Sequence, residues 1–430
     1  MSIRHLFWAR GAAALGACLS LLTPLAAQPP ANIHVALAEV LKAATENWEV
    51  TLSEKDAEAA KADVMAANRA PLPILSAKTS SIDLQNGVGA GSLWQQKRVD
   101  KSVGLDWTWE RADKQQLRAR TSESLSQAAQ TDVLEVKLQQ KQIALEAFYE
   151  LLAAQERQQE LIGLWQGYEQ LLIATRKRLQ AGDVSAQDLN RISIETERAR
   201  AETESAYLAR WRAAHQLALL MRQASPAQGL PQAIGSWPKT SAAALGEPAF
   251  DNVVHVWLEQ RPSVKAAQNR LEASKAALAL AQAQKTSDIT WGSSFDHFPG
   301  NSTRMLELRM QMPLQWGYGF EGEIRRAAAQ NEQAENLLAK TLQSARHELL
   351  NLYQSWRTTH SKVQIYEQTL LPKAQLVATQ AELAYQQGAL PLTDLLEARR
   401  TLRATRLEGL LAKVEHAKAH GLWQLNTNAP

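Results

Sequence analysis

Cysteine is nearly absent from this chain of 430 residues, which contains only Cys18. The cysteine lies in the opening segment "MSIRHLFWARGAAALGACLSLLTPLAAQPP", where Arg4 and Arg10 precede an apolar run and Ala26 and Ala27 precede a polar break. This order of features is typical of an export signal, and we expect cleavage after Ala27. The mature chain would then lack cysteine, so no disulfide would support it in an oxidising compartment.

Lipidation is the alternative role for Cys18, because the preceding Leu15, Gly16 and Ala17 resemble a lipoprotein processing site. Against it, only seven residues separate Arg10 from Cys18, and the apolar run continues beyond the cysteine. Such a short stretch fits poorly with the apolar core of a lipoprotein signal, so we favour cleavage after Ala27.

Long apolar runs and an excess of one charge are also missing after the signal. No later stretch has some twenty consecutive apolar residues, which excludes a second membrane helix and leaves any membrane role to another architecture. Loss of Arg4 and Arg10 takes the 47 basic residues to 45, against 44 acidic ones. This near-neutral balance gives no reason to expect a nucleic acid or another polyanion as partner.

Motifs of known enzymes are absent as well. There is no Gly-x-Ser-x-Gly, His-Glu-x-x-His or paired-cysteine motif, and "NGVGAGS" (86–92) neither opens an apolar helix nor contains Lys followed by Ser or Thr. His416 and His420 lie one helical turn apart, but no third and fourth metal ligand lies near them in the sequence. We therefore predict no enzyme, no cofactor and no metal site.

The residues that dominate the chain are Ala, Leu, Gln, Glu, Lys and Arg, a composition typical of long helices and coiled coils. From about Ala112 to Ala181 there is no proline, and apolar residues recur every three or four positions. At about 1.5 Å per residue, such a helix would extend roughly 100 Å, far more than a globular domain needs.

The pattern changes to strict alternation in four segments: 74–82, 101–110, 287–298 and 304–312. Helical spacing predicts helices over 34–70, 185–224, 261–284, 321–387 and from the second corner to about 425. The plan of helix, two strands, long helix, corner and helix therefore occurs twice. We divide the chain into a signal (1–27), a first repeat (28–224), a Pro- and Gly-rich connector (225–250), a second repeat (251–425) and a tail (426–430).

The two corners have similar sequences, "RLQAGDVSAQDL" and "YQQGALPLTDLL". Gly182 and Gly388 permit the left-handed backbone that ends a helix, and Ser185 or Pro391 begins the next one. Ser185 with Asp188 resembles a capping box that has Asp in place of Glu. Acids in a first turn complement the helix dipole, which is a sufficient structural reason for Asp188, for its counterpart Asp394 and for Glu397.

Each copy also carries a residue that weakens a helix at nearly the same distance before its corner. Pro372 lies sixteen residues before Gly388, and Gly167 lies fifteen before Gly182. We expect both long helices to bend there.

The alternating segments have one apolar and one polar face, which has two explanations. A small soluble sheet explains the alternation by itself. In an exported chain, strands of this length also fit a transmembrane barrel, with apolar residues toward lipid and polar residues toward a water-filled lumen. In the second case several chains must share one wall, because four strands cannot close it. The predicted lipid-facing residues are Val103, Leu105, Trp107, Trp109, Leu306, Leu308 and Met310, and the predicted lumen-facing residues are Asp106, Thr108, Glu307 and Arg309.

The twofold repeat, the proline break after the first helix, the long helices and the paired corners resemble the TolC-type outer-membrane efflux protein family over essentially the whole mature chain. The resemblance implies a mainly α protein with a small transmembrane β part, in which long helical hairpins and four strands per protomer close only as a trimer. It further implies a passive duct through periplasm and outer membrane, surrounded there by lipid and joined to an inner-membrane pump through a periplasmic adaptor.

The resemblance also gives roles to corner residues. It places the corners at periplasmic tips, with Asp394 and Glu397 as charged rings in the entrance, Asp188 as an acid that holds the tips shut, and Tyr385 at the constriction. The chain departs from the pattern at Leu390, where some members carry a basic residue. An aspartate, tyrosine and arginine latch of that form is therefore not expected here.

Two questions stay open at this level. The alternative function is a periplasmic coiled-coil adaptor or scaffold with a soluble sheet. For the exported solute, the short chain resembles the compact heavy-metal (CzcC-like) branch somewhat more than exporters of drugs or proteins.

Overall fold

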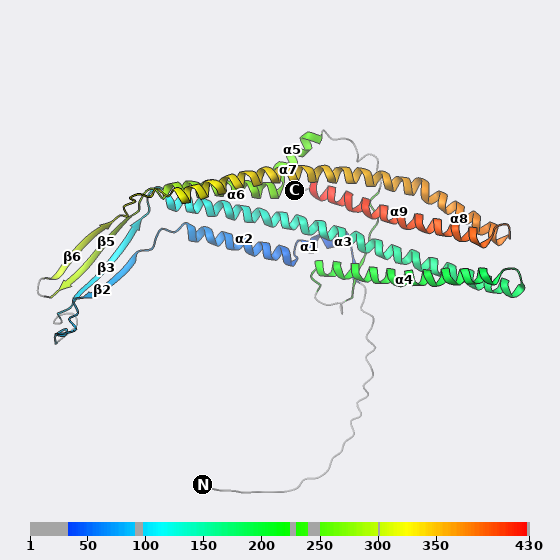
Figure 1. The fold of residues 1–430 in the computed structure, drawn as a ribbon, viewed down its shortest axis with the longest axis horizontal. Coiled ribbons are helices and arrows are strands. Elements are labelled where there is room, and N and C mark those ends of the chain that lie inside the picture. Colours follow the sequence, from blue (N-terminus) through cyan, green and yellow to red (C-terminus); the bar gives the residue numbers. More distant parts are fainter. Residues whose placement is uncertain (1–32, 91–97, 224–228, 240–249, 300–301, 428–430) are drawn as a thin grey trace, which may run out of the picture.

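The computed structural model describes residues 33–90, 98–223, 229–239, 250–299 and 302–427, and the chain forms a long, bent rod. Four strands lie at one end and the two helical corners at the other (Figure 1). The predicted signal with Cys18, most of the 225–250 connector and the last three residues of the tail lie outside the described residues.

The first repeat consists of a short strand, two helices, a strand pair and a helical hairpin. Its elements are β1 (Ile33–Val35), α1 (Leu37–Ala44), α2 (Trp48–Ala67), β2 (Ile74–Ser80), β3 (Asp100–Trp109), α3 (Lys114–Ala181) and α4 (Ala186–Leu220). The uninterrupted 68 residues of α3 confirm the predicted long helix.

The second repeat has the same plan, with one interruption in its long helix. Its elements are α5 (Phe250–Gln260), α6 (Pro262–Ala283), β5 (Ile289–Phe298), β6 (Ser302–Gln311), α7 (Glu321–Ile365), a π-helical turn (Tyr366–Leu370), α8 (Leu371–Gln386) and α9 (Leu392–Thr427), while the short strand β4 (Pro231–Ala233) lies in the connector. We call the interruption the π-turn. It lies immediately before Pro372, where we expected a bend, because proline cannot donate the backbone bond that a regular helix requires.

The helices differ from the expected pattern in three places. Residues 34–70 form not one helix but β1, α1 and α2, because Asn47 caps a new helix by accepting a hydrogen bond from the Val50 N–H at 3.1 Å. The α5 helix was not expected at all. In the first repeat, α3 continues through Gly167 without a change of helix type, so the two copies are not equally interrupted.

Strands β2, β3, β5 and β6 form one antiparallel sheet in that order. Each repeat contributes a hairpin-like pair, and β3 joins β5 at the centre with Trp107 opposite Trp291. The outer edges of β2 and β6 have no partner strand among the described residues. Because open edges readily pair with further strands, both edges of this sheet are available to strands of another chain.

A buried cluster joins the four long helices near the middle of the rod. The Arg261 side chain is 6% exposed and donates to Asn426 Oδ1 at 2.5 Å, to Glu135 Oε1 at 3.0 Å and to Glu348 Oε2 at 3.1 Å. These partners come from α9, α3 and α7, so one guanidinium at the start of α6 holds three other helices.

No helix in the described part of the chain combines the length and the apolar character needed to cross a bilayer.

Candidate functional site

Both corners end their first helix in the same way. Gly182 has φ +84° and Gly388 has φ +76°, the left-handed conformation that favours glycine. At the first corner the Asp183 N–H donates to the Arg178 carbonyl at 2.9 Å, and at the second the Ala389 N–H donates to the Ala384 carbonyl at 2.9 Å. This six-to-one bond defines a Schellman motif, so the predicted equivalence of the two glycines is confirmed at the level of backbone geometry.

The helices that leave the corners begin differently. Asp188 N–H donates to Ser185 Oγ at 3.1 Å, and the Ser185 hydroxyl donates to Asp188 Oδ2 at 2.7 Å, so the predicted capping box is present. Pro391 lies one position before α9, and its carbonyl accepts from the Asp394 N–H at 3.2 Å. It therefore occupies the cap position instead of the first helical turn.

An open recess of about 650 Å³ lies between the corners, and it brings together six of the residues singled out from the sequence. Ser185, Asp188, Tyr385 and Pro391 line it together with both corner glycines. Asp394 and Glu397 lie outside the recess with exposed side chains. The structure thus separates the predicted acids into one that faces the other corner and two that face solvent.

The recess also contains two basic residues that the sequence reading missed. Arg178 and Arg191 line it beside Asp188, and the Arg178 guanidinium lies 5.2 Å from the centre of the Tyr385 ring. Their positions carried a usable signal, since Arg178 is in the last turn of α3, where a cation complements the helix dipole. Positive charge is present at this tip although position 390 is leucine.

Tyr385 borders the recess, but most of its side chain is buried in the tip. Its side chain is 9% exposed and packs with Tyr168, Ile192 and Leu395. The Oη atoms of Tyr385 and Tyr168 are both buried with no hydrogen-bond partner among the described residues. Tyr385 therefore belongs to the apolar core between the two hairpins in this structure.

An arginine row on α9 joins the two helical hairpins, and it consists of Arg399, Arg400, Arg403 and Arg406. Arg400 donates to Glu195 Oε1 at 2.6 Å and Arg406 to Glu160 Oε2 at 3.0 Å, while Arg403 pairs with Glu202. These three acids belong to the first repeat, whereas the partner of Arg399 is Glu382 of α8.

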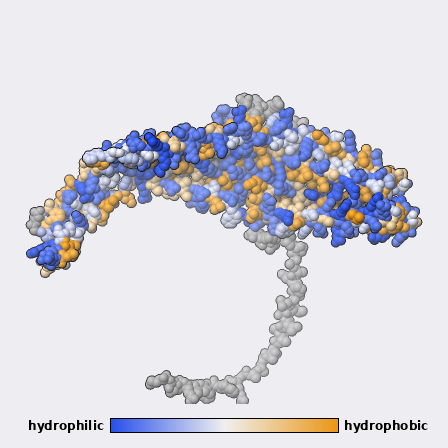
Figure 2. Space-filling model, in the orientation of Figure 1, coloured by the Kyte–Doolittle hydropathy of each residue, from blue (hydrophilic) through white to orange (hydrophobic). Residues whose placement is uncertain are grey.

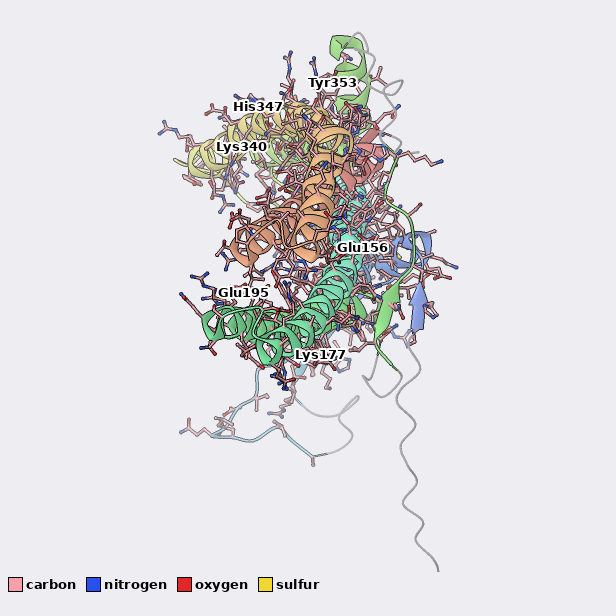
Figure 3. All side chains as sticks on the ribbon, turned by 90° about the vertical axis from the view of Figure 1, so that its right-hand side faces the viewer. Glu156, Lys177, Glu195, Lys340, His347 and Tyr353 are labelled. Carbon is pink, nitrogen blue, oxygen red and sulfur yellow. The ribbon has the colours of Figure 1, made fainter. Side chains whose placement is uncertain are left out.

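The Glu195 side chain is only 8% exposed, and its hydrogen bond raises the pKa of Arg400. In the view along the rod, Glu195 lies on the side of α4 that faces the α8–α9 hairpin (Figure 3). The sequence reading did not single out this row.

On the sheet, the predicted apolar residues share one face and are exposed. Their exposed fractions in the protomer run from 45% for Val103 to 78% for Leu308. The register places Phe295 between Val103 and Leu306, and Trp291 between Trp107 and Met310. Hydrophobic and hydrophilic residues alternate on the surface at this end (Figure 2). In a soluble sheet, other elements would pack over such an apolar face. In the described part of the protomer, these side chains are exposed instead.

The opposite face carries the predicted polar residues, and an ion pair crosses it. Arg309 Nη2 of β6 lies 2.5 Å from Asp106 Oδ1 of β3, across Gly292 of β5. A Cβ at Gly292 would lie 2.4 Å from Asp106 Oδ1, so glycine makes the room for this pair. Thr108 shares a hydrogen bond of 2.9 Å with Thr290, and Glu307 lies on the same face with an exposed side chain.

Comparisons with known proteins show which family, relative and solved structures this chain resembles. Residues 253–420 match the family model described as "Outer membrane efflux protein", which covers the helices of the second repeat, its strand pair and its corner. The cobalt-zinc-cadmium resistance protein CzcC of Cupriavidus metallidurans is 23% identical over 391 residues, which are 90% of this chain and 87% of the relative. The second repeat thus resembles the outer membrane efflux protein family.

Solved structures agree on the fold of the chain. The CmeC outer membrane channel of Campylobacter jejuni superposes with a TM-score of 0.76 at 15% identity, covering 91% of this chain and 85% of that one. VceC of Vibrio cholerae gives 0.74 at 18% identity, covering 91% and 96%. The chain thus has the fold of these outer membrane channels, with four strands at one end and long helices over the rest. The matched family model is described as one of efflux proteins.

Proposed function

We propose that this chain is an outer membrane efflux protein, three copies of which close a passive duct that joins an adaptor and an inner-membrane pump in a tripartite export system. The observation that carries the proposal is the sheet. One face is apolar and exposed, the other carries the Asp106–Arg309 pair, and the outer edges of β2 and β6 are unpartnered in the described protomer.

The antiparallel order determines how copies would join. Strands alternate in direction from β2 to β6, so β6 of one protomer would meet β2 of the next in antiparallel orientation. Lipid cannot satisfy free backbone groups, so a membrane location requires both edges to be paired. Closure then places Leu306 and Leu308 toward lipid and the ion pair toward the lumen.

Cysteine crosslinking tests this arrangement, and the chain suits it because its one native cysteine lies in the predicted signal. Variants would combine Leu75→Cys on β2 with Leu306→Cys, Leu308→Cys or Met310→Cys on β6. These positions share a face, so at least one pair is expected to give crosslinked trimers in native outer membranes.

The matched control combines Ser76→Cys with Leu308→Cys, because adjacent strand residues point to opposite faces. This control is expected to give little crosslinking. The scaffold alternative predicts that none of the cysteine pairs gives a trimer and that osmotic shock releases the protein without detergent.

For the exported solute, we propose divalent transition-metal cations. The relative CzcC is named for resistance to cobalt, zinc and cadmium, and it aligns with 90% of this chain. In the closed trimer, the exposed Asp394 and Glu397 would surround the entrance with carboxylates, which attract cations. We further infer that Arg178 and the arginine row oppose opening of this entrance, since Arg178 stacks on Tyr385 of α8 and three arginines of the row pair with acids of the first repeat.

Growth assays test the proposed solute independently of the proposed trimeric duct. In a deletion strain that keeps its pump and adaptor, restoring the gene is expected to restore tolerance to zinc, cobalt or cadmium salts. Restored tolerance to hydrophobic drugs alone would refute the proposed solute and leave the trimeric duct intact.

A further inference from the structure

Three histidines lie together where α7 packs against α9, at a level between the buried Arg261 cluster and the π-turn. The ring centroids of His360 and His416 are 5.4 Å apart, and those of His416 and His420 are 5.9 Å apart. His416 is 2% exposed and His360 is 4% exposed. No group of three or more potential metal ligands among the described residues has an arrangement that would hold a metal ion, so this cluster is not a preformed metal site.

His416 is unusual because both of its ring nitrogens are buried and neither has a hydrogen-bond partner in the described chain. A buried polar group without a partner costs about 1–3 kcal/mol. Burial, followed by the nearby His360 and His420, lowers the pKa of His416 from 6.5 to about 4, so the ring is neutral at pH 7. Burial and His360 also lower the pKa of His420.

The charged residues of α9 closest to His416 in sequence are Lys413, Glu415 and Lys418, and their ion-pair partners come from the π-turn, α7 and α3. Several of them are already paired, with Lys362 2.8 Å from Glu415 and Lys418 2.7 Å from Glu150. None forms a hydrogen bond with a ring nitrogen of His416. A proton added to this ring would therefore place an unpaired charge in the interior.

The same contact between α7 and α9 continues to the π-turn. Tyr366 Oη donates to Glu408 Oε2 at 3.2 Å, and the missing side chain of Gly409 lets Leu371 approach closely. These polar contacts are exposed and contribute little stability. The buried histidines, together with the buried Val363 and Ala412, thus lie on the part of the α7–α9 contact that leads to the interruption between α7 and α8.

We propose that the contact of His416 with His360 and His420 forms an acid-sensitive latch, which holds α7 on α9 while His416 is neutral and releases it when His416 is protonated. A charged imidazolium is far more stable in water than in this unpaired interior, so protonation favours the separated helices. Release beside the π-turn would free the α8–α9 hairpin, and with it the second corner, to move relative to α3 and α4. The latch rests on the protomer contacts alone and does not require the proposed solute.

The direction and size of the pH effect on opening follow from the difference between the pKa values of His416 in the closed and open states. A histidine with a lowered folded pKa stabilises the closed contact above pH 6.5, and that stability is lost progressively as the pH falls toward 4. If His416 regains its ordinary pKa of 6.5 in the open state, the open fraction rises about twentyfold between pH 7 and pH 5.

Hydrogen–deuterium exchange of the detergent-solubilised full-length protein tests the latch. Rates at pH 7 and pH 5 would be divided by the intrinsic rates of an unstructured peptide. Segments 353–370 and 405–423 are expected to open about twentyfold more at pH 5 in the wild type. In His416→Leu, which cannot be protonated there, most of this increase should be lost.

The control is His255→Leu, because the side chain of His255 is 77% exposed on α5, and this variant should keep the wild-type increase. The latch would be overturned if the corrected exchange rates of the wild type did not change between pH 7 and pH 5, or if His416→Leu showed the same increase at pH 5 as the wild type. Zinc titration is a second arm: stabilisation by micromolar zinc that His416→Leu abolishes would show a metal site in its place. Should His416→Leu fail to fold, His420→Gln provides the same comparison at a less buried position.

Discussion

Replacing Gly292 by alanine tests how the polar face of the sheet is built. The added methyl group would lie 2.4 Å from Asp106 Oδ1 and 3.2 Å from Arg309 Nε, so the ion pair must separate or the strands must move. The Asp106 side chain is 18% exposed and that of Arg309 is 43% exposed, so the pair alone contributes less than about 1 kcal/mol. Overpacking adds to that loss, and we expect a destabilisation of about 1–3 kcal/mol per protomer.

Urea unfolding in detergent micelles, followed by tryptophan fluorescence, gives the measurement, since Trp107 and Trp291 lie opposite each other beside Gly292. A double-mutant cycle with Arg309→Met isolates the cause. If the clash with the ion pair dominates, Gly292→Ala will cost less in the Arg309→Met background than in the wild type. Equal costs in both backgrounds, or no cost in either, would refute the assignment of Gly292 as the residue that makes room for the pair.

Three further predictions concern the corners. Gly388→Ala should lower the stability of the protein by about 1–2 kcal/mol in thermal unfolding, because φ is +76° and the site is otherwise open; Gly163→Ala, inside α3 with equal room, should not. Ser185→Ala should cost about 1 kcal/mol through loss of the capping box, and Ser185→Asp should recover most of it; an unchanged melting temperature in Ser185→Ala would contradict this. In planar bilayers, Asp394→Ala should lower the preference of the duct for cations over anions, whereas Glu58→Ala on exposed α2 should leave it unchanged; identical reversal potentials for wild type and Asp394→Ala would count against the entrance ring.

The sequence was most informative where local chemistry decides the structure. The paired glycines require a left-handed backbone, and Ser185 with Asp188 supplies its own cap, so both corners could be predicted within a residue or two. The alternation around Val103 and Leu306 likewise predicted four strands and which of their residues share a face. Short elements such as β1 and β4 were missed, because three residues carry no measurable period.

The tip was predicted less completely, because its contacts join residues far apart in the chain. Arg400 and Glu195 are ordinary exposed-looking residues in their own helices, and only packing of the two hairpins brings them together. Tyr385 illustrates the same limit: its position before Gly388 was clear, but its burial depends on Tyr168 and Ile192 from the first repeat. Local patterns say which face a residue occupies and not which distant helix covers it.

The parallel pairing of β1 with β4 has a consequence for how the chain matures. His34 aligns with Gln232, and Gln155 of α3 holds β4 by exchanging two hydrogen bonds with Ala233 at 2.8 and 3.0 Å. Strand β1 emerges during synthesis about two hundred residues before its partner, and so distant a contact forms late. The β1 segment must therefore wait unpaired until the connector between the repeats has followed it, so that this contact can close only after the whole first repeat is present.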